Sequence, residues 1–118
     1  MRMTDMGRRI KVLWVRQEYL DMILAGRKTV EVRVAYTNLT RLHPGDLLLL
    51  NEQHTYEIVR ISRYAGFEGL LAEEDTGQIA PDSSPAELLA ILRELYPPEK
   101  EALGVLAIEI TRHVDNGD

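Results

Sequence analysis

The residues best suited to chemistry lie together in one short segment, "GRKTVEVR", at positions 26–33. Lys28 supplies an ammonium group, Glu31 a carboxylate and Arg33 a guanidinium. Glu31 and Arg33 are two residues apart, so on a strand their side chains share one face. A guanidinium holds a phosphate through two hydrogen bonds, and a carboxylate accepts from an exocyclic amine such as cytosine N4. The segment therefore indicates a site for a nucleotide-like ligand.

Several roles are open for these side chains. Once desolvated, the ammonium group of Lys28 can lose its proton near neutral pH and act as a general base. A neighbouring carboxylate, here Glu31, instead stabilises the protonated form, which is a good anion anchor and a poor base. Alternatively, Glu31 and Arg33 form only an exposed ion pair that contributes under about 1 kcal/mol. Their spacing alone does not decide between these interpretations.

The composition excludes several kinds of site. The chain has 118 residues and no cysteine, so disulfides, thiolate metal sites and cysteine nucleophiles are ruled out. The three histidines lack metal-ligand spacing, and we expect neither a metal nor a cofactor. No apolar run is long enough to cross a bilayer, and residues 1–12 contain no apolar signal region. We expect a cytoplasmic protein without membrane contact, folded as a single domain over residues 1–118 with its core at about 8–113.

Charge is distributed unevenly along the chain. Residues 1–64 contain eleven Lys/Arg against seven Asp/Glu, a net charge of +4, whereas residues 65–118 contain three against twelve, a net charge of −9. The segment at 26–33 belongs to the basic half, so an anionic ligand is expected there. Alternatively, the asymmetry only reflects an acidic half that serves as a solubilising surface. A protein-interaction domain that binds no nucleic acid is a third interpretation.

Strand and helix patterns alternate around the charged segment. Period-2 or continuous apolar runs predict strands at 8–15, 29–34, 46–51, 55–64 and 104–113, and helical periodicity predicts helices at 17–26, 67–74 and 84–96. Gly26 fits a left-handed helix end, and Ser84, Pro85 and Glu87 form a predicted capping box. We expect an α+β fold: a small, mainly antiparallel β-barrel with two to three helices packed at its rim, closed by pairing of the last strand with the first. The tail at 114–118 is expected to fray.

Within this scheme, Val30, Val32 and Val34 are expected in the core, with Glu31 and Arg33 facing a cleft. The aromatic residues Trp14, Tyr64 and Phe67 are expected to pack in the core, although each offers a face on which a base can stack.

Five segments in this order resemble the ASCH domain family of the PUA-like superfamily over roughly residues 11–111: "YLDMILAGRKTVEVR", "HPGDLLLL", "YEIVRISRYAGFEGLLAEE", "LRELYP" and "GVLAIEI". "GRKTVEVR" matches the family pattern G-x-K-[TS]-x-E-x-R. The resemblance implies a five- or six-stranded barrel with a cleft beside the first helix that binds RNA or a modified nucleoside. The ligand-binding residues expected there are Arg27, Lys28, Thr29, Glu31 and Arg33.

The resemblance also implies an enzymatic alternative. Some small members are similar to an amidohydrolase that deacetylates N4-acetylcytidine with a lysine, a threonine three residues later and a glutamate from a later helical segment; others are ribonucleases. Lys28 matches the lysine, Glu31 stands at the threonine position, and the later glutamate corresponds to Glu73 or Glu74. The candidate catalytic set is Lys28, Glu31 and Glu74. Because Glu31 favours a protonated Lys28, we expect an RNA- or nucleotide-binding module rather than a hydrolase.

Overall fold

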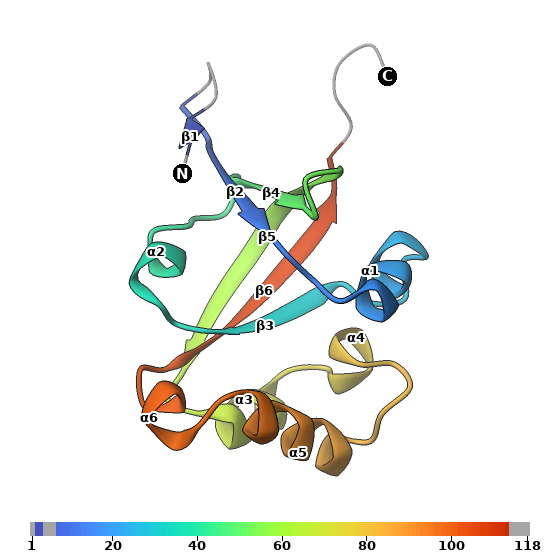
Figure 1. Cartoon of the computed structure of the whole chain (residues 1–118), viewed down its shortest axis with the longest axis vertical. Helices are drawn as coiled ribbons and strands as arrows, with labels where there is room; N and C mark the ends of the chain where they lie inside the picture. Colours follow the sequence, from blue (N-terminus) through green and yellow to red (C-terminus); the bar gives the residue numbers. More distant parts are fainter. Residues whose placement is uncertain (1, 4–6, 114–118) are drawn as a thin grey trace.

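The structure, a computed structural model, describes residues 2–3 and 7–113. Six strands form one curved sheet, a half-barrel, in the order β1-β2-β4-β5-β6-β3 (Figure 1). Strands β2 and β4 run parallel, and the other neighbouring pairs run antiparallel. The strands are β1 Arg2–Met3, β2 Arg9–Leu13, β3 Val30–Val34, β4 Leu47–Leu50, β5 His54–Tyr64 and β6 Val105–Arg112. The predicted mainly antiparallel α+β fold is confirmed.

The last strand does not close the sheet against the first, so that expectation was wrong. Strand β6 lies inside the sheet, between β5 and β3. Its residues Val105 to Ile108 are all buried, because both faces of this strand are covered. A strand with two apolar faces is more stable in the interior of a sheet than at an edge. The edge position passes to β3, the strand that carries the charged segment.

The three predicted helices are present, together with three single turns. The predicted ones are α1 Gln17–Leu24, α3 Phe67–Glu73 and α5 Pro85–Leu95, and the additional ones are α2 Thr37–Thr40, α4 Thr76–Ile79 and α6 Pro98–Glu101. Four-residue turns carry too little periodicity to be recognised in a sequence. Gly26 has φ 78°, the left-handed conformation expected after α1. The capping box of Ser84 and Glu87 at the start of α5 is also confirmed.

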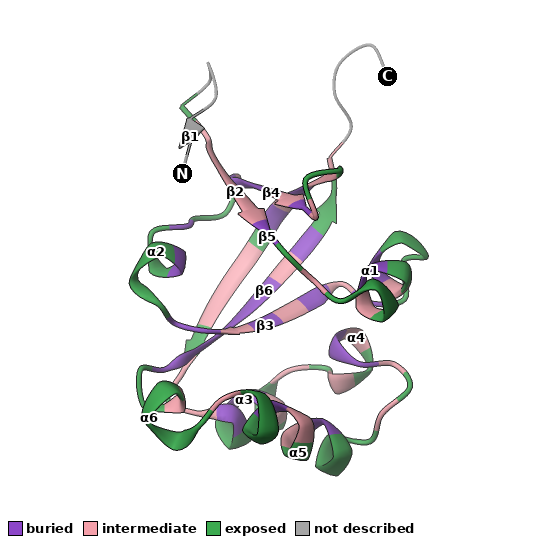
Figure 2. Cartoon of the chain, viewed as in Figure 1, coloured by how far each residue is buried: buried purple, intermediate pink, exposed green. Residues whose placement is uncertain are grey.

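The sheet has a hydrophobic core on each side (Figure 2). One core includes residues of α1 and of the inner sheet face, such as Leu20 and Ile108. The other packs the valines of β3 against α3, α4 and α5, with Val30, Val32 and Val34 only 4%, 5% and 0% exposed. The predicted burial of these valines is thereby confirmed, and Figure 1 shows β3 running between α1 and the other helix group.

Of the three aromatic residues expected in the core, two are buried at least in part and the third is exposed. Phe67 is fully buried, and Tyr64 is partly buried against the second core. Trp14, in contrast, is 62% exposed. It follows the last residue of β2, the buried Leu13, so strand alternation turns it away from the core.

The predicted fraying of residues 114–118 lies outside the described residues. Among residues 2–3 and 7–113, none of the helices has both the length and the apolar character needed to span a membrane.

The capping box generates a stability prediction. Replacing Ser84 by alanine removes the hydroxyl that accepts from the Glu87 N–H, and we expect a loss of about 1 kcal/mol of unfolding free energy. The neighbouring Ser83 does not cap α5, so Ser83→Ala is the matched control, with an expected change below about 0.5 kcal/mol. Urea denaturation measures both, and equal losses would show that the cap is not a stabilising feature.

Candidate functional site

The free edge of β3 organises the charged segment. The carbonyl of Thr29 accepts from the N–H of Ile110 on β6, so the odd-numbered residues of β3 bond toward β6. The peptide groups of Val30, Val32 and Val34 therefore point to the other side, where no further strand is paired in the described sheet. Two side chains of the same segment bond to these peptide groups instead: Lys28 donates to the carbonyl of Val30, and Glu31 accepts from the N–H of Val32.

Lys28 is the most buried charged side chain of this edge. It is only 3% exposed, and its Nζ lies 2.7 Å from the carbonyl oxygen of Val30 and 2.7 Å from that of Ile79. The third contact is Glu31 Oε1 at 3.3 Å. An ammonium group has three N–H donors, so each has an acceptor inside the protein. Burial lowers the pKa of Lys28 below its ordinary value, and the carboxylate of Glu31 partly offsets this effect.

Glu31 links Lys28 to the rest of the edge. Its Oε1 also accepts from the N–H of Val32 at 3.1 Å, and its Oε2 accepts from Arg33 Nη2 at 3.0 Å. Burial alone would raise the pKa of Glu31, but the positive charges of Lys28 and Arg33 together outweigh it and hold this pKa below its ordinary value. Glu31 is therefore ionised at neutral pH, and of its four acceptor positions one, on Oε2, is left.

Arg33 is held in place by one of its nitrogens. Nη2 donates to Glu31 and, at 2.7 Å, to the carbonyl oxygen of Trp14. Among the described residues no hydrogen bond reaches its Nη1 or Nε, so three of its five N–H donors remain for a ligand. The side chain is 21% exposed, which leaves it accessible while its position is fixed.

A pocket of about 220 Å³ opens beside this edge, between α1, α4 and α5. Its charged lining consists of Arg16, Lys28, Glu31 and Arg33, three cations and one anion. An apolar wall comes from α5 and the residue after it: Leu88, Ile91, Leu92, Leu95 and Tyr96. A flat apolar group can lie against this wall, and the excess of positive charge favours an anion.

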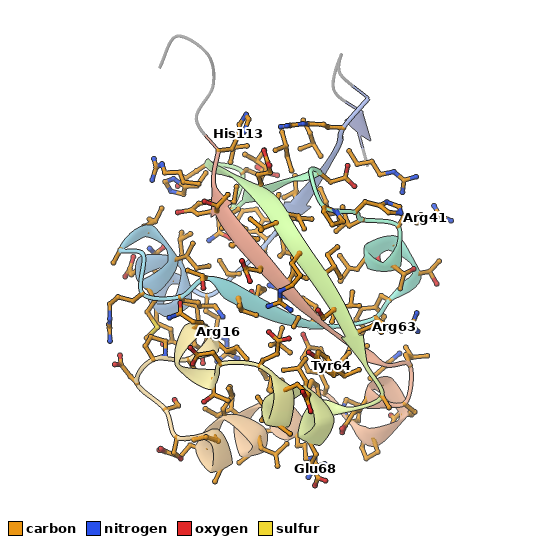
Figure 3. The ribbon with its side chains drawn as sticks, turned by 180° about the vertical axis from the view of Figure 1, so that it is seen from behind. Arg16, Arg41, Arg63, Tyr64, Glu68 and His113 are labelled. Atoms are coloured by element: carbon orange, nitrogen blue, oxygen red, sulfur yellow. The ribbon has the colours of Figure 1, made fainter. Side chains whose placement is uncertain are left out.

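Arg16 is a pocket residue that the sequence analysis missed. It is exposed at the N-terminal end of α1, and within the described part of the chain its side chain forms no hydrogen bond or ion pair. Figure 3 shows it in the region between α1 and α4. The residue lies ten positions before the charged segment, and only the fold brings the two together.

The leucines of α5 were missed as pocket residues for a different reason, because an amphipathic pattern does not distinguish a core from a pocket wall.

Two of the predicted ligand-binding residues lie elsewhere. Arg27 forms an exposed ion pair with Asp82 at 2.6 Å. The hydroxyl of Thr29 donates to Gln78 Oε1 at 2.7 Å, which ties β3 to α4. Neither side chain is part of the pocket lining. The structure thus brings together Lys28, Glu31 and Arg33 and leaves Arg27 and Thr29 outside.

The predicted catalytic Glu74 belongs to a different cluster. It accepts from two nitrogens of Arg60, at 2.8 and 2.9 Å, and from the hydroxyl of Tyr64. Figure 3 shows Tyr64 near the end of β5, beside α3. Hydrogen bonds from Arg60 hold the pKa of Glu74 below its ordinary value. Neither Glu73 nor Glu74 lines the pocket. Across residues 2–3 and 7–113 no three His, Asp or Glu side chains form a group that could hold a metal ion.

Comparison with known proteins identifies the family. The ASCH domain profile matches residues 13–113. The chain belongs to the ASCH domain family. An ASCH domain has a PUA-like fold of the RNA-binding type, and the predicted family is confirmed.

Two solved structures are similar to this ASCH domain. The crystal structure of hypothetical protein PH0355 has a TM-score of 0.82 and 27% sequence identity, and covers 89% of this chain and 99% of its own. The solution NMR structure of protein PF0455 from Pyrococcus furiosus has a TM-score of 0.73 and 26% identity, with coverages of 87% and 96%. None of the curated proteins matches the chain.

The geometry of Lys28 generates a second prediction. Lys28→Met leaves the carbonyls of Val30 and Ile79 without a donor and Glu31 without a countercharge, so we expect a loss of about 3 kcal/mol of unfolding free energy. Lys100→Met is the control, because the side chain of Lys100 is exposed and lies over the ring of Tyr36; its expected loss is below about 1 kcal/mol. Similar losses in urea denaturation would contradict the structural role of Lys28.

Proposed function

We propose that this ASCH domain binds RNA or a nucleotide in the pocket between β3 and α5. The observation that carries the proposal is Arg33. Its guanidinium is fixed by Glu31 and by the Trp14 carbonyl, while three of its N–H groups have no acceptor among the described residues. Such a fork matches the oxygens of a phosphate, and its fixed position reduces the entropy lost on binding.

The remaining lining fits the other parts of a nucleotide. Leu92 and Tyr96 offer an apolar surface for the flat face of a base. The free acceptor position on Glu31 Oε2 and the carbonyl of Val32, which points to the open edge, suit the N–H groups of a base edge. Arg16 adds a second cation for phosphate. Each part of a nucleotide therefore has a matching group in one pocket.

The hydrolytic alternative has less support. A general base accepts a proton, so Lys28 would have to be a neutral amine, yet its ammonium group has an acceptor within the protein for each of its three N–H donors. The glutamate proposed as its partner, Glu74, is bound by Arg60 and Tyr64 away from the pocket lining. These contacts favour a positioning role for Lys28 and a binding role for the pocket.

Substitution of Arg33 tests the proposed site. In titration calorimetry with the four ribonucleoside 5′-monophosphates and short RNAs, we expect Arg33→Ala to weaken binding at least about ten-fold, because charge-assisted hydrogen bonds to phosphate are lost. Arg63→Ala is the matched control: Arg63 is also a strand arginine that donates to a main-chain carbonyl, that of Leu103, and Figure 3 shows it well separated from Arg16. Its affinity is expected to equal that of the wild type. If the wild-type protein binds none of these ligands, the proposed function is wrong.

Binding is expected to depend weakly on salt. Two arginines of the pocket lining keep donors that no described residue accepts from, so one or two phosphates are engaged. Since each phosphate of a single strand contributes about −0.7 to the slope of log K against log salt concentration, the expected slope lies between about −0.7 and about −1.4. Anisotropy titrations of a labelled RNA at several salt concentrations measure it. A steep slope would place most of the binding on another surface, and a zero slope would exclude phosphate contacts.

A further inference from the structure

Trp14 is an exposed aromatic residue directly before two residues that line the pocket. Its exposed fraction of 62% is the highest among the large hydrophobic side chains of the described residues. Single exposed hydrophobic residues are common, so the position of this one matters more than its exposure. Its carbonyl oxygen is bound by Arg33, and the next two residues, Val15 and Arg16, line the pocket. An exposed aromatic residue thus precedes by two positions an arginine of the pocket lining that has no side-chain partner among the described residues.

The size of the pocket limits what it can enclose. Its volume of about 220 Å³ is below the range of roughly 300–1,000 Å³ typical of pockets that enclose a whole drug-sized ligand. One nucleotide base fits such a space, and the atoms attached to it must extend through the mouth. The exposed side chain of Trp14 and the guanidinium of Arg16, two residues further along, match the two repeating parts of a nucleic acid strand, the base and the phosphate.

We propose that the ligand is single-stranded RNA of at least two nucleotides. One base occupies the pocket, the adjacent base stacks on Trp14, and the phosphate between them pairs with Arg16. The strand must be single because a base inside a duplex has both faces covered by its neighbours and cannot stack on a side chain. This inference rests on the proposed function and adds to it the length of the ligand and the role of Trp14.

The chain provides its own probe for this contact. Trp14 is the single tryptophan, so intrinsic tryptophan fluorescence reports on this side chain alone. For each of the four bases, the 5′-monophosphate and the corresponding RNA trinucleotide are titrated into the protein. We expect each trinucleotide that binds to quench the emission strongly, and a bound mononucleotide to change it little. We also expect the best trinucleotide to bind about ten-fold more tightly than its mononucleotide, within the range given by one stacked base.

Variants separate stacking from other effects. Trp14→Ala is expected to abolish the ten-fold gain of the trinucleotide in calorimetry and to leave the mononucleotide affinity unchanged. The hydrogen bond from Arg33 goes to the main-chain carbonyl of residue 14, so this substitution leaves it possible. Leu103→Ala is the control, since Leu103 is a hydrophobic residue of 45% exposure that does not line the pocket; both affinities are expected to be unaffected.

The outcomes distinguish this inference from the proposed function. Equal affinities for mononucleotide and trinucleotide with unchanged emission would overturn the stacking role and leave nucleotide binding in the pocket intact. Full retention of the trinucleotide gain in Trp14→Ala would overturn it as well. Absence of binding of every ligand to the wild-type protein would overturn the proposed function and, with it, this inference.

Discussion

The buried ammonium group of Lys28 is the interaction on which the pocket depends. It contacts the carbonyl of Val30 on β3, the carbonyl of Ile79 on α4 and the carboxylate of Glu31. A buried charge is tolerated in a folded protein only when it is fully paired, so these three acceptors must stay in place together. Lys28 also occupies the position from which a neighbouring strand would donate to Val30. It therefore fixes α4 against the sheet and keeps β3 as an edge strand.

A chain of ion pairs runs along the edge of β3 from Lys28 through Glu31 to Arg33. Glu31, held ionised by two cations, positions the guanidinium of Arg33, and Arg33 in turn binds the carbonyl of Trp14. The charges of the segment 26–33 thus have two functions. Lys28 and most of the acceptor capacity of Glu31 stabilise the protein. Arg33, which lines the pocket together with Arg16, keeps three N–H donors that no described residue accepts from.

Local patterns in the sequence predicted local structure well. Alternation over residues 29–34 predicted which side chains of β3 are buried, and the capping box predicted the start of α5, because each depends on residues a few positions apart. The missed features depend on distant contacts. Ile79 is 51 residues from Lys28, Arg60 competes for Glu74 from 14 residues away, and β6 becomes central only after β3 pairs with it. No local pattern could therefore show that Lys28 has no donor left, or that Arg16 joins the pocket.

The protonation state of Lys28 tests this account most directly. The chain has only three lysines, so an NMR titration that follows the side-chain nitrogens resolves Lys28 readily. We predict that Lys28 is fully protonated at pH 7, although burial lowers its pKa, because three acceptors require three N–H donors. A neutral amine at pH 7 would leave one acceptor without a donor. That result would contradict the structural role of Lys28 and would favour its action as a general base.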